Sequence, residues 1–283
     1  MRNLKDTYVL NNGVQIPCVG FGTWQVPDGN IAVESVAIAL ENGYVHIDTA
    51  AAYDNESSVG RAVIESGIDR KSLFITTKIP NYVRGYEQAI SQIDKSIMLL
   101  GTDYIDLMLI HWPAPKLFRD TWEQSNAETW RAMEDAVRDG KLRAIGVSNF
   151  LPHHMEALKK TERMAPAVNQ IRLCPGDAHQ PTIDYCEKRG ILLQAYSPLG
   201  TGALLGLPEL VKLAEIKGRT PAQLLLRWSL QNGFLPLPKS VTKERIISNA
   251  QIFDFDLTKD EMELISRLSA EEISFRDPDT RPF

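Results

Sequence analysis

The 283-residue chain predicts an α/β fold, a (β/α)8 TIM barrel with an N-terminal β-hairpin and a C-terminal helix and tail. Eight short apolar runs alternate with helix-like segments, an order that is typical of parallel sheets. The runs are rich in Val, Ile and Leu, as strands buried on both faces require. No linker, repeat or low-complexity tract interrupts the alternation. We therefore expect one barrel domain over residues 1–283.

The strands are expected in regular order behind a short hairpin. Residues 8–16, YVLNNGVQI, form that hairpin in this interpretation, because Asn and Gly tolerate the positive φ of a tight turn. The expected barrel strands then cover residues 19–22, 45–48, 73–78, 105–111, 142–148, 167–171, 191–197 and 234–240.

Helical patterns fill the intervals between the strands. Apolar side chains recur on one face of residues 31–42 and of residues 86–100. Residues 220–233, TPAQLLLRWSLQNG, begin with a Thr cap and a Pro at the first helical position. The alternative fold, a doubly wound open sheet, normally carries a glycine fingerprint after its first strand. Residues 19–25, VGFGTWQ, lack the third glycine of that fingerprint.

Composition argues against several classes of partner. The chain is 43% hydrophobic and 24% charged, with a formal net charge of −5, so we expect neither nucleic acid nor an anionic membrane as a partner. The N-terminus lacks an apolar signal core, and no apolar run is long enough to span a bilayer. Cys18, Cys174 and Cys186 form no metal or redox motif, which indicates reduced thiols in a cytoplasmic protein.

Four ionisable side chains follow three adjacent strands. Asp48 ends the second strand, Tyr53 lies in the next loop, Lys78 ends the third strand and His111 ends the fourth. Catalytic groups of such barrels lie at the carboxyl ends of the strands, so we expect all four at one rim. Each one alone has a commoner structural explanation, namely a loop bond, packing, a solvated ammonium or a core histidine. Their coincidence on adjacent strands favours a site.

This set of side chains suits proton delivery to a carbonyl group. Tyrosine has an ordinary pKa of about 10, and a neighbouring ammonium lowers it. We therefore expect Lys78, held by Asp48, to lower the pKa of Tyr53 and make it a general acid. His111 would orient the carbonyl oxygen by a hydrogen bond. The set contains no group that attacks the carbonyl carbon, so we expect a nicotinamide cofactor as hydride source.

Three long motifs resemble the aldo-keto reductase family: GYVHIDTAAAYDNESSVG at 43–60, KLRAIGVSNF at 141–150 and LPKSVTKERIISN at 237–249. The resemblance covers nearly the whole chain. It implies a monomeric reductase of small-molecule carbonyl compounds, similar to short bacterial members that reduce aldehydes, methylglyoxal-like dicarbonyls, 2,5-diketogluconate and keto acids. It also implies a catalytic set with one proton donor, Tyr53, and three further members, Asp48, Lys78 and His111.

The resemblance further implies NADPH, preferred over NADH, extended across the barrel mouth. Tyr196 resembles the aromatic residue that stacks on the nicotinamide ring, and a polar trio resembles the clamp on its carboxamide: Ser148, Asn149 and Gln170. Two cations and two hydroxyls suit the 2′-phosphate: Lys239, Ser240, Thr242 and Arg245. The full set implied for the cofactor is Gly22, Thr23, Asp48, Ser148, Asn149, Gln170, Tyr196, Ser197, Leu199, Gly200, Lys239, Ser240, Thr242, Arg245 and Asn249.

The substrate is expected to contact two apolar walls, Trp24 and Trp112, together with Tyr53 and His111. Pro80 stands where many relatives place an aromatic residue, which removes one wall of the usual pocket.

Two more departures from the family pattern affect the mouth of the barrel. Ser248 replaces a frequent Glu near the adenine, so that contact is weakened. The C-terminal tail, residues 271–283, is short and polar, and we expect it to leave the pocket open.

Two other functions compete with a reductase. The first is a metal-dependent barrel hydrolase. His46 and Asp48 are two residues apart on one strand, so both can face inward and hold a metal. The chain lacks an HxH motif, and His153 and His154 are expected to face solvent near a helix start. The second is a non-catalytic NADP(H)-binding redox sensor subunit, against which the intact catalytic set argues.

Overall fold

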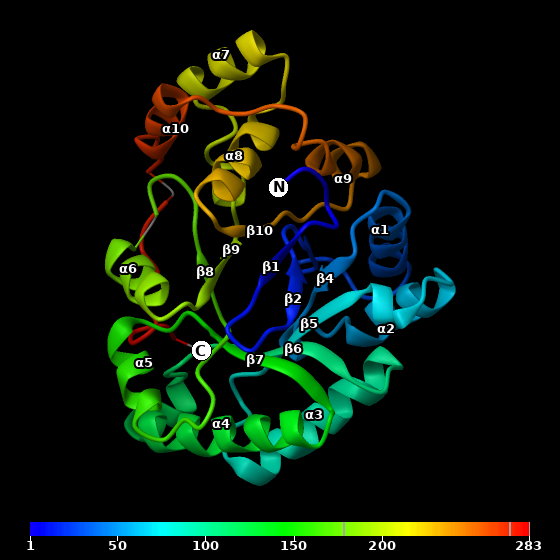
Figure 1. Ribbon diagram of the computed structural model, residues 1–283, viewed down its shortest axis with the longest axis vertical. Helices are drawn as coiled ribbons and strands as arrows, with labels where there is room; N and C mark the ends of the chain where they lie inside the picture. Colours follow the sequence, from blue (N-terminus) through cyan, green and yellow to red (C-terminus); the bar gives the residue numbers. More distant parts are fainter. Residues whose placement is uncertain (178, 272, 283) are drawn as a thin grey trace.

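A parallel barrel forms the centre of the computed structural model, which describes residues 1–177, 179–271 and 273–282 (Figure 1). Its eight strands pair in chain order, and the amides of Gly20 and Gly22 close the ring by donating to the carbonyls of Pro236 and Pro238. The predicted barrel is therefore confirmed. The strands are β3 (Phe21–Gly22), β4 (His46–Asp48), β5 (Phe74–Ile79), β6 (Ile105–Ile110), β7 (Leu142–Ser148), β8 (Val168–Arg172), β9 (Leu192–Tyr196) and β10 (Leu235–Leu237).

The last strand is shorter than the sequence predicted. We expected residues 234–240, whereas β10 ends at Leu237. Pro236 and Pro238 have no amide hydrogen to donate to a ladder, so they limit strand pairing here. The residues after β10 are consequently free to form a loop at the barrel mouth.

An antiparallel hairpin closes the amino-terminal end of the barrel. Its strands are β1 (Thr7–Val9) and β2 (Gln15–Pro17), and Figure 1 shows them in front of the barrel strands. Ile16 and Leu10 are buried in one cluster with side chains from the barrel interior, among them Phe74. This packing plugs one end of the barrel and leaves the opposite end open.

Ten α-helices surround the barrel among the described residues. The expected apolar faces are buried, as Val36 of the first helix and Ile93 of the third illustrate. The predicted Thr220 cap begins the eighth, where it forms a capping box with Gln223. The helices are α1 (Asn30–Glu41), α2 (Glu56–Glu65), α3 (Tyr86–Leu100), α4 (Trp122–Arg138), α5 (Pro152–Lys159), α6 (Gln180–Lys188), α7 (Pro208–Lys217), α8 (Pro221–Gln231), α9 (Lys243–Ala250) and α10 (Lys259–Ser266).

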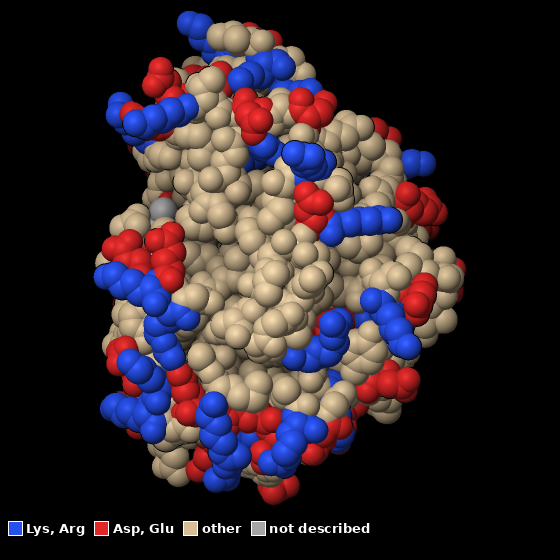
Figure 2. All heavy atoms as spheres, viewed as in Figure 1, with Lys and Arg blue, Asp and Glu red and all other residues tan. Residues whose placement is uncertain are grey.

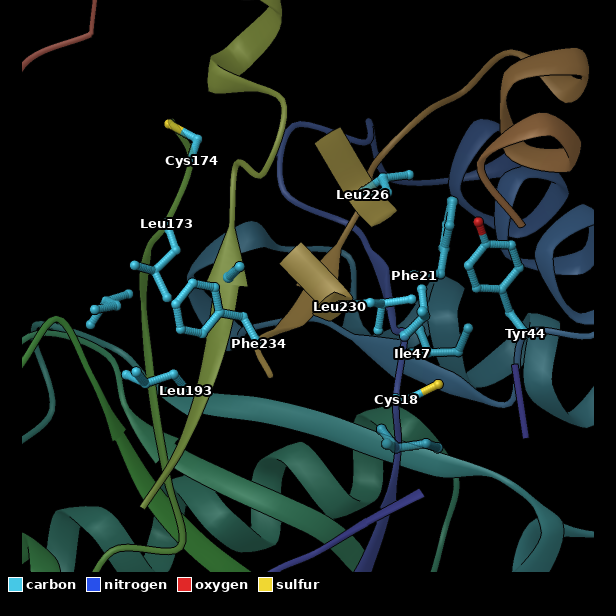
Figure 3. Packing of buried hydrophobic residues seen from close by; sticks show 14 of the residues in the cluster. Cys18, Phe21, Tyr44, Ile47, Leu173, Cys174, Leu193, Leu226, Leu230 and Phe234 are labelled. Carbon is cyan, nitrogen blue, oxygen red and sulfur yellow. The ribbon is translucent and has the colours of Figure 1, made fainter. Parts of the chain in front are cut away.

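The core lies between the strands and the helices. Figure 3 shows Phe21, Tyr44 and Ile47 near Leu226 and Leu230 of α8. The rings of Phe21 and Tyr44 meet edge to face with centroids 5.8 Å apart, a favourable aromatic geometry. Packing of this kind fixes the strand ends on which the site is built.

The three cysteines are buried free thiols. Burial raises the pKa of Cys18 to about 12 and those of Cys174 and Cys186 to about 11. They therefore stay protonated at neutral pH and behave as small apolar side chains.

The surface seen in Figure 2 carries interspersed cations and anions around its edge and uncharged residues at its centre. No single-sign patch dominates this face. Within the described residues, no helix has the length and apolarity that crossing a membrane requires.

Candidate active site

A cavity of about 820 Å³ opens at the carboxyl-terminal ends of the barrel strands. Residues at successive strand ends line it, from Gly22 on β3 to Lys239 after β10. This is the end of the barrel that the hairpin leaves open, and it is where parallel barrels carry their chemistry.

A buried ion pair stands at the base of this cavity. Strand register places Asp48 opposite Thr76, so Lys78, two residues further, points to the same side of the sheet. Lys78 Nζ lies 2.6 Å from Asp48 Oδ1 and donates to the carbonyl oxygen of Thr49 at 2.8 Å. Gln170 Nε2 donates to the other carboxylate oxygen at 2.7 Å. Every charge of the pair is thus directly bonded, as burial requires.

Burial opposes the ionised form of both partners. It raises the pKa of Asp48 and lowers the pKa of Lys78, while their mutual attraction acts in the opposite direction on each. The lysine side chain is fully buried and does not line the cavity. It can therefore act only through Asp48 and Tyr53, which do line it.

Tyr53 is placed by a short 3₁₀ turn, Ala51–Tyr53, that ends in a left-handed residue, Asp54, at φ 56°. Its ring centroid lies 5.1 Å from Lys78 Nζ and 5.7 Å from the centroid of the His111 ring. Two of the other three predicted catalytic side chains, Lys78 and His111, thus lie beside the phenol ring, and Asp48 joins them through Lys78.

Asn55 and Glu56, which follow Tyr53 closely in the chain, brace its loop. Asn55 is fully buried, accepts from Thr49 Oγ1 at 2.7 Å and donates to the carbonyls of Thr23 and Val26. Glu56 accepts from Thr77 Oγ1 at 2.6 Å. These contacts explain why the motif carries polar residues immediately after the tyrosine.

The expected effect of Lys78 on Tyr53 is wrong in direction. Burial raises the pKa of Tyr53 well above its ordinary value, and the Asp48 carboxylate raises it further. The charge of Lys78, which is paired with Asp48 at 2.6 Å, does not outweigh these two effects. Tyr53 is therefore a phenol at neutral pH, with its proton available to give.

His111 is a neutral imidazole. Burial lowers its pKa well below its ordinary value, and the charges of Lys78 and Arg84 lower it further. A neutral imidazole can donate one hydrogen bond without adding charge to the cavity. This agrees with the orienting role expected for it.

The two tryptophans expected to contact the substrate both lie at the cavity. Trp24 is 39% exposed and Trp112 is 8% exposed, and both line the cavity. After β5, Asn81 lines the cavity and Pro80 does not.

A buried arginine that the sequence analysis missed holds one of these tryptophans. Arg84 donates to the backbone carbonyls of Trp112, Pro80 and Val83. It faces no carboxylate within ion-pair distance among the described residues, and burial lowers its pKa to about 9. Arg84 therefore ties the loop after β5 to the loop after β6, a role that no motif announces.

The predicted carboxamide clamp forms one connected group. Tyr196 Oη donates to Asn149 Oδ1 at 2.9 Å, and Asn149 Nδ2 donates to the carbonyl of His111 at 3.0 Å. Ser148 Oγ donates to the carbonyl of Gln170 at 2.8 Å. Asn149 adopts a left-handed φ of 62°, a conformation that Asn tolerates better than most residues. All four side chains line the cavity.

The opposite end of the cavity is cationic. Lys239, Ser240, Arg245 and Asn249 line it after β10 and along α9. The Lys239 and Arg245 side chains make no ion pair or hydrogen bond with any described residue, and Ser197 and Leu199 line the cavity on the neighbouring loop.

Four residues of the predicted site do not line the cavity: Thr23, Lys78, Gly200 and Thr242. Thr23 instead donates to the carbonyl of Asp48, and Thr242 precedes α9 without a capping bond. A Cβ on Gly200 would clash with Ile273 and Leu204.

The C-terminal tail does not leave the mouth free, contrary to expectation. Arg172 donates to the carbonyl of Ser274, and the ring of Phe275 stacks on His179 with centroids 4.9 Å apart. The next residue, Arg276, lines the cavity. Only the three-dimensional path of the tail brings Arg276 here. Glu272 and Phe283, within the expected tail, lie outside the described residues.

His154 is buried, contrary to the expectation that it faces solvent. Its Nδ1 accepts from the amide of Leu151, and its Nε2 lies 2.8 Å from Asp279 Oδ1. Exposed His153 approaches the same carboxylate at 3.2 Å. This pairing fastens the tail to the start of α5.

These three side chains are the only described group of His, Cys, Asp or Glu close enough together to share one metal ion. None of them lines the cavity. Because Nδ1 of neutral His154 already accepts a backbone amide, its proton lies on Nε2, and no lone pair remains there for a metal. His46 is buried separately, bonded to Thr76, and burial lowers its pKa to about 3.

Known proteins resemble this chain in sequence and structure. The model of the Aldo/keto reductase family matches residues 18–270. A glyoxal reductase of Bacillus subtilis (strain 168) is 46% identical over 277 residues, which are 98% of each chain. An aldo/keto reductase of Brucella melitensis aligns with a TM-score of 0.87 at 41% identity, covering 93% of this chain and 99% of its own. An aldo-keto reductase of Bombyx mori, solved in complex with NADP, aligns with a TM-score of 0.85 at 37% identity over 92% and 91% of the two chains.

Proposed function

The chain belongs to the aldo/keto reductase family, and on that premise we propose that it reduces aldehydes or ketones with NADPH, with Tyr53 as the proton donor. The observation that carries the proposal is the arrangement at the base of the cavity. A protonated phenol, a neutral imidazole and a buried lysine–aspartate pair meet at one point there.

The residues at the mouth fit a phosphorylated dinucleotide. Lys239 and Arg245 are unpaired cations at one end of the cavity, and an arginine fork suits a phosphate. At the other end, Gln170 Oε1 accepts no hydrogen bond from a described residue, although Gln170 Nε2 is fully engaged. An amide group of a ligand could donate to that oxygen. NADPH, when bound, supplies the hydride for the carbonyl carbon.

The protein's own side chains act on the carbonyl oxygen. His111 donates a hydrogen bond to that oxygen and orients it between the imidazole and the phenol. Tyr53 then gives its proton to the oxygen as negative charge develops there. Lys78 stabilises the phenolate that remains, and Asp48 holds Lys78 in position. The tryptophan walls exclude water from this end.

Purified protein tests the proposal by NADPH oxidation against a panel of aldehydes, dicarbonyls and keto acids. We expect turnover of at least one reactive aldehyde or dicarbonyl, since the 46%-identical relative is a glyoxal reductase. Folded protein that binds NADPH and turns over no member of the panel would refute the proposal and favour a redox sensor. Stoichiometric zinc in the purified protein would favour a hydrolase.

A further inference from the structure

We infer that Arg276 is a specificity-determining residue, which binds a carboxylate carried by the carbonyl substrate. The inference rests on the proposed function and extends it from the reaction to the class of substrate. Arg276 comes from the C-terminal tail and lines the same cavity as Tyr53 and His111.

The guanidinium of Arg276 is unoccupied among the described residues. It is half-buried, and it makes no hydrogen bond or ion pair with any of them. The other cations near the cavity have different tasks. Lys78 is paired with Asp48 behind the wall, and Lys239 and Arg245 lie beyond β10 along α9.

The tail holds Arg276 in place from both sides. On one side, Ser274 accepts a hydrogen bond from Arg172 and Phe275 stacks on His179. On the other, Asp279 bonds His154 at 2.8 Å. A residue between two such anchors has little freedom to swing away from the mouth. The backbone position of Arg276 is therefore fixed, which reduces the entropy lost when a ligand binds.

The surroundings favour an anion at this position. Arg172 Nε lies 3.2 Å from Asp177 Oδ2, and both side chains are almost fully buried, so their charges cancel. Arg276 is close enough to affect the pKa of Asp177 and of Tyr196, and it adds one net positive charge to this pair. An anion that enters the cavity can bind the planar guanidinium of Arg276, whose N–H groups match a carboxylate in two parallel hydrogen bonds.

Among the described residues, the side chains at the base of the cavity carry no free charge. Tyr53 is protonated, His111 is neutral, and Asp48 is paired with Lys78. A carboxylate attached to the carbonyl compound therefore meets one partner, Arg276. Another source of the same chemistry is a phosphate of the cofactor, because the loop after Tyr196 also lines the cavity. The experiment has to separate these two sources.

The test compares two isosteric aldehydes, 4-carboxybenzaldehyde and uncharged 4-formylbenzamide, in the wild type, Arg276→Met and Arg276→Lys. We expect Arg276→Met to lower kcat/KM for the carboxylate by about 10- to 100-fold, mainly through KM, as for a lost charge-assisted bond. Turnover of the amide and the Kd for NADPH stay unchanged. Arg276→Lys falls between the two, because it keeps the charge and loses the fork.

A matched control is Arg267→Met, which removes a cation whose side chain is 80% exposed and lies outside this cavity. It should leave both aldehydes unaffected. In the wild type, added salt should raise KM for the carboxylate only. Thermal unfolding of each variant establishes that the fold is intact.

Two outcomes would overturn the inference while the reductase proposal stands. In one, kcat/KM falls by the same factor for both aldehydes in Arg276→Met. In the other, the Kd for NADPH weakens, which assigns Arg276 to the cofactor. If neither aldehyde is reduced, the proposed function fails for them. Calorimetric binding of the two aldehydes in the presence of NADP⁺ then decides: tighter binding of the carboxylate, lost in Arg276→Met, supports the inference, and equal binding overturns it.

Discussion

Tyr53 shows how a single side chain can be an acid although its environment makes it a weaker one. Burial raises its pKa, so it carries its proton throughout the neutral range. Reduction of a carbonyl creates an alkoxide, which is a far stronger base than a phenolate, so proton transfer stays downhill. The contribution of Lys78 therefore comes in the transition state, when negative charge forms on the phenol, and not in the resting protein.

Replacing Tyr53 by Phe should lower kcat by about 10²- to 10⁴-fold, the usual contribution of a general acid. The ring and its contact with His111 are retained, so NADPH affinity should barely change. Steady-state kinetics and fluorescence titration measure the two quantities. Near-normal kcat in this variant would mean that another group supplies the proton.

Arg245→Ala should weaken NADPH by about 10- to 100-fold and NADH far less, because only NADPH carries the 2′-phosphate. Arg245 lines the cavity, whereas Lys243, in the same helix, is exposed and does not. Lys243→Ala is thus the matched control in fluorescence titrations with both dinucleotides. An equal loss for NADPH and NADH would show that Arg245 contacts some other part of the cofactor.

At the scale of elements, long-range ties fix the loops around the mouth. Arg84 joins the loops after β5 and β6 through three carbonyls, including that of Trp112. Asp279 joins the tail to the start of α5. Both ties connect segments that the chain separates, so the mouth behaves as one structure.

Arg84→Met should lower the free energy of unfolding by about 1–3 kcal/mol, because it leaves buried carbonyls without donors. The wall that carries Trp112 should also loosen, so KM for aldehydes should rise more than kcat falls. Urea unfolding and steady-state kinetics measure these effects. Unchanged KM together with lower stability would restrict Arg84 to a structural role.

The tie at α5 should make stability depend on pH. Burial lowers the pKa of His154 to about 4, with His153 lowering it further and Asp279 opposing, whereas the unfolded chain titrates near its ordinary value of about 6.5. The unfolded state therefore binds the extra proton between these values. Stability is complete above about pH 6.5 and falls as the pH drops toward 4, by at most about 3 kcal/mol.

His154→Gln removes that titration and keeps a side-chain amide near Asp279. Its free energy of unfolding should fall less than that of the wild type between pH 7 and pH 5, in urea titrations at both pH values. His153→Gln, at an exposed neighbour, is the control. The same acid dependence in all three proteins would place the effect elsewhere.

At the scale of the whole molecule, the sequence predicted what depends on local pattern. The alternation of Val- and Ile-rich runs with amphipathic helices gave the barrel, and the rule that chemistry lies at strand ends gave Asp48, Lys78 and His111. The length of β10 was missed by a few residues, because Pro238, which has no amide hydrogen, follows the last paired residue, Leu237.

Features that depend on packing between distant segments were missed. The direction of the pKa shift of Tyr53 follows from burial, which no single motif encodes. Arg84 and Arg276 stand in unremarkable sequence and acquire their roles only when loops and tail meet. His154 resembled a solvent-facing residue until Asp279, 125 positions later, covered it.

The hairpin at the amino-terminal end has a kinetic consequence for the open end. The hairpin of β1 and β2 closes that end with Leu10 and Ile16. Ligands can therefore enter and leave the barrel only at its carboxyl-terminal end. When two ligands bind one above the other in a site with a single opening, the ligand that binds last has to leave first. If the dinucleotide lies deeper, the alcohol has to leave before the spent cofactor can be exchanged. The order in which product and cofactor leave then depends on two short strands at the opposite end of the barrel from the candidate active site.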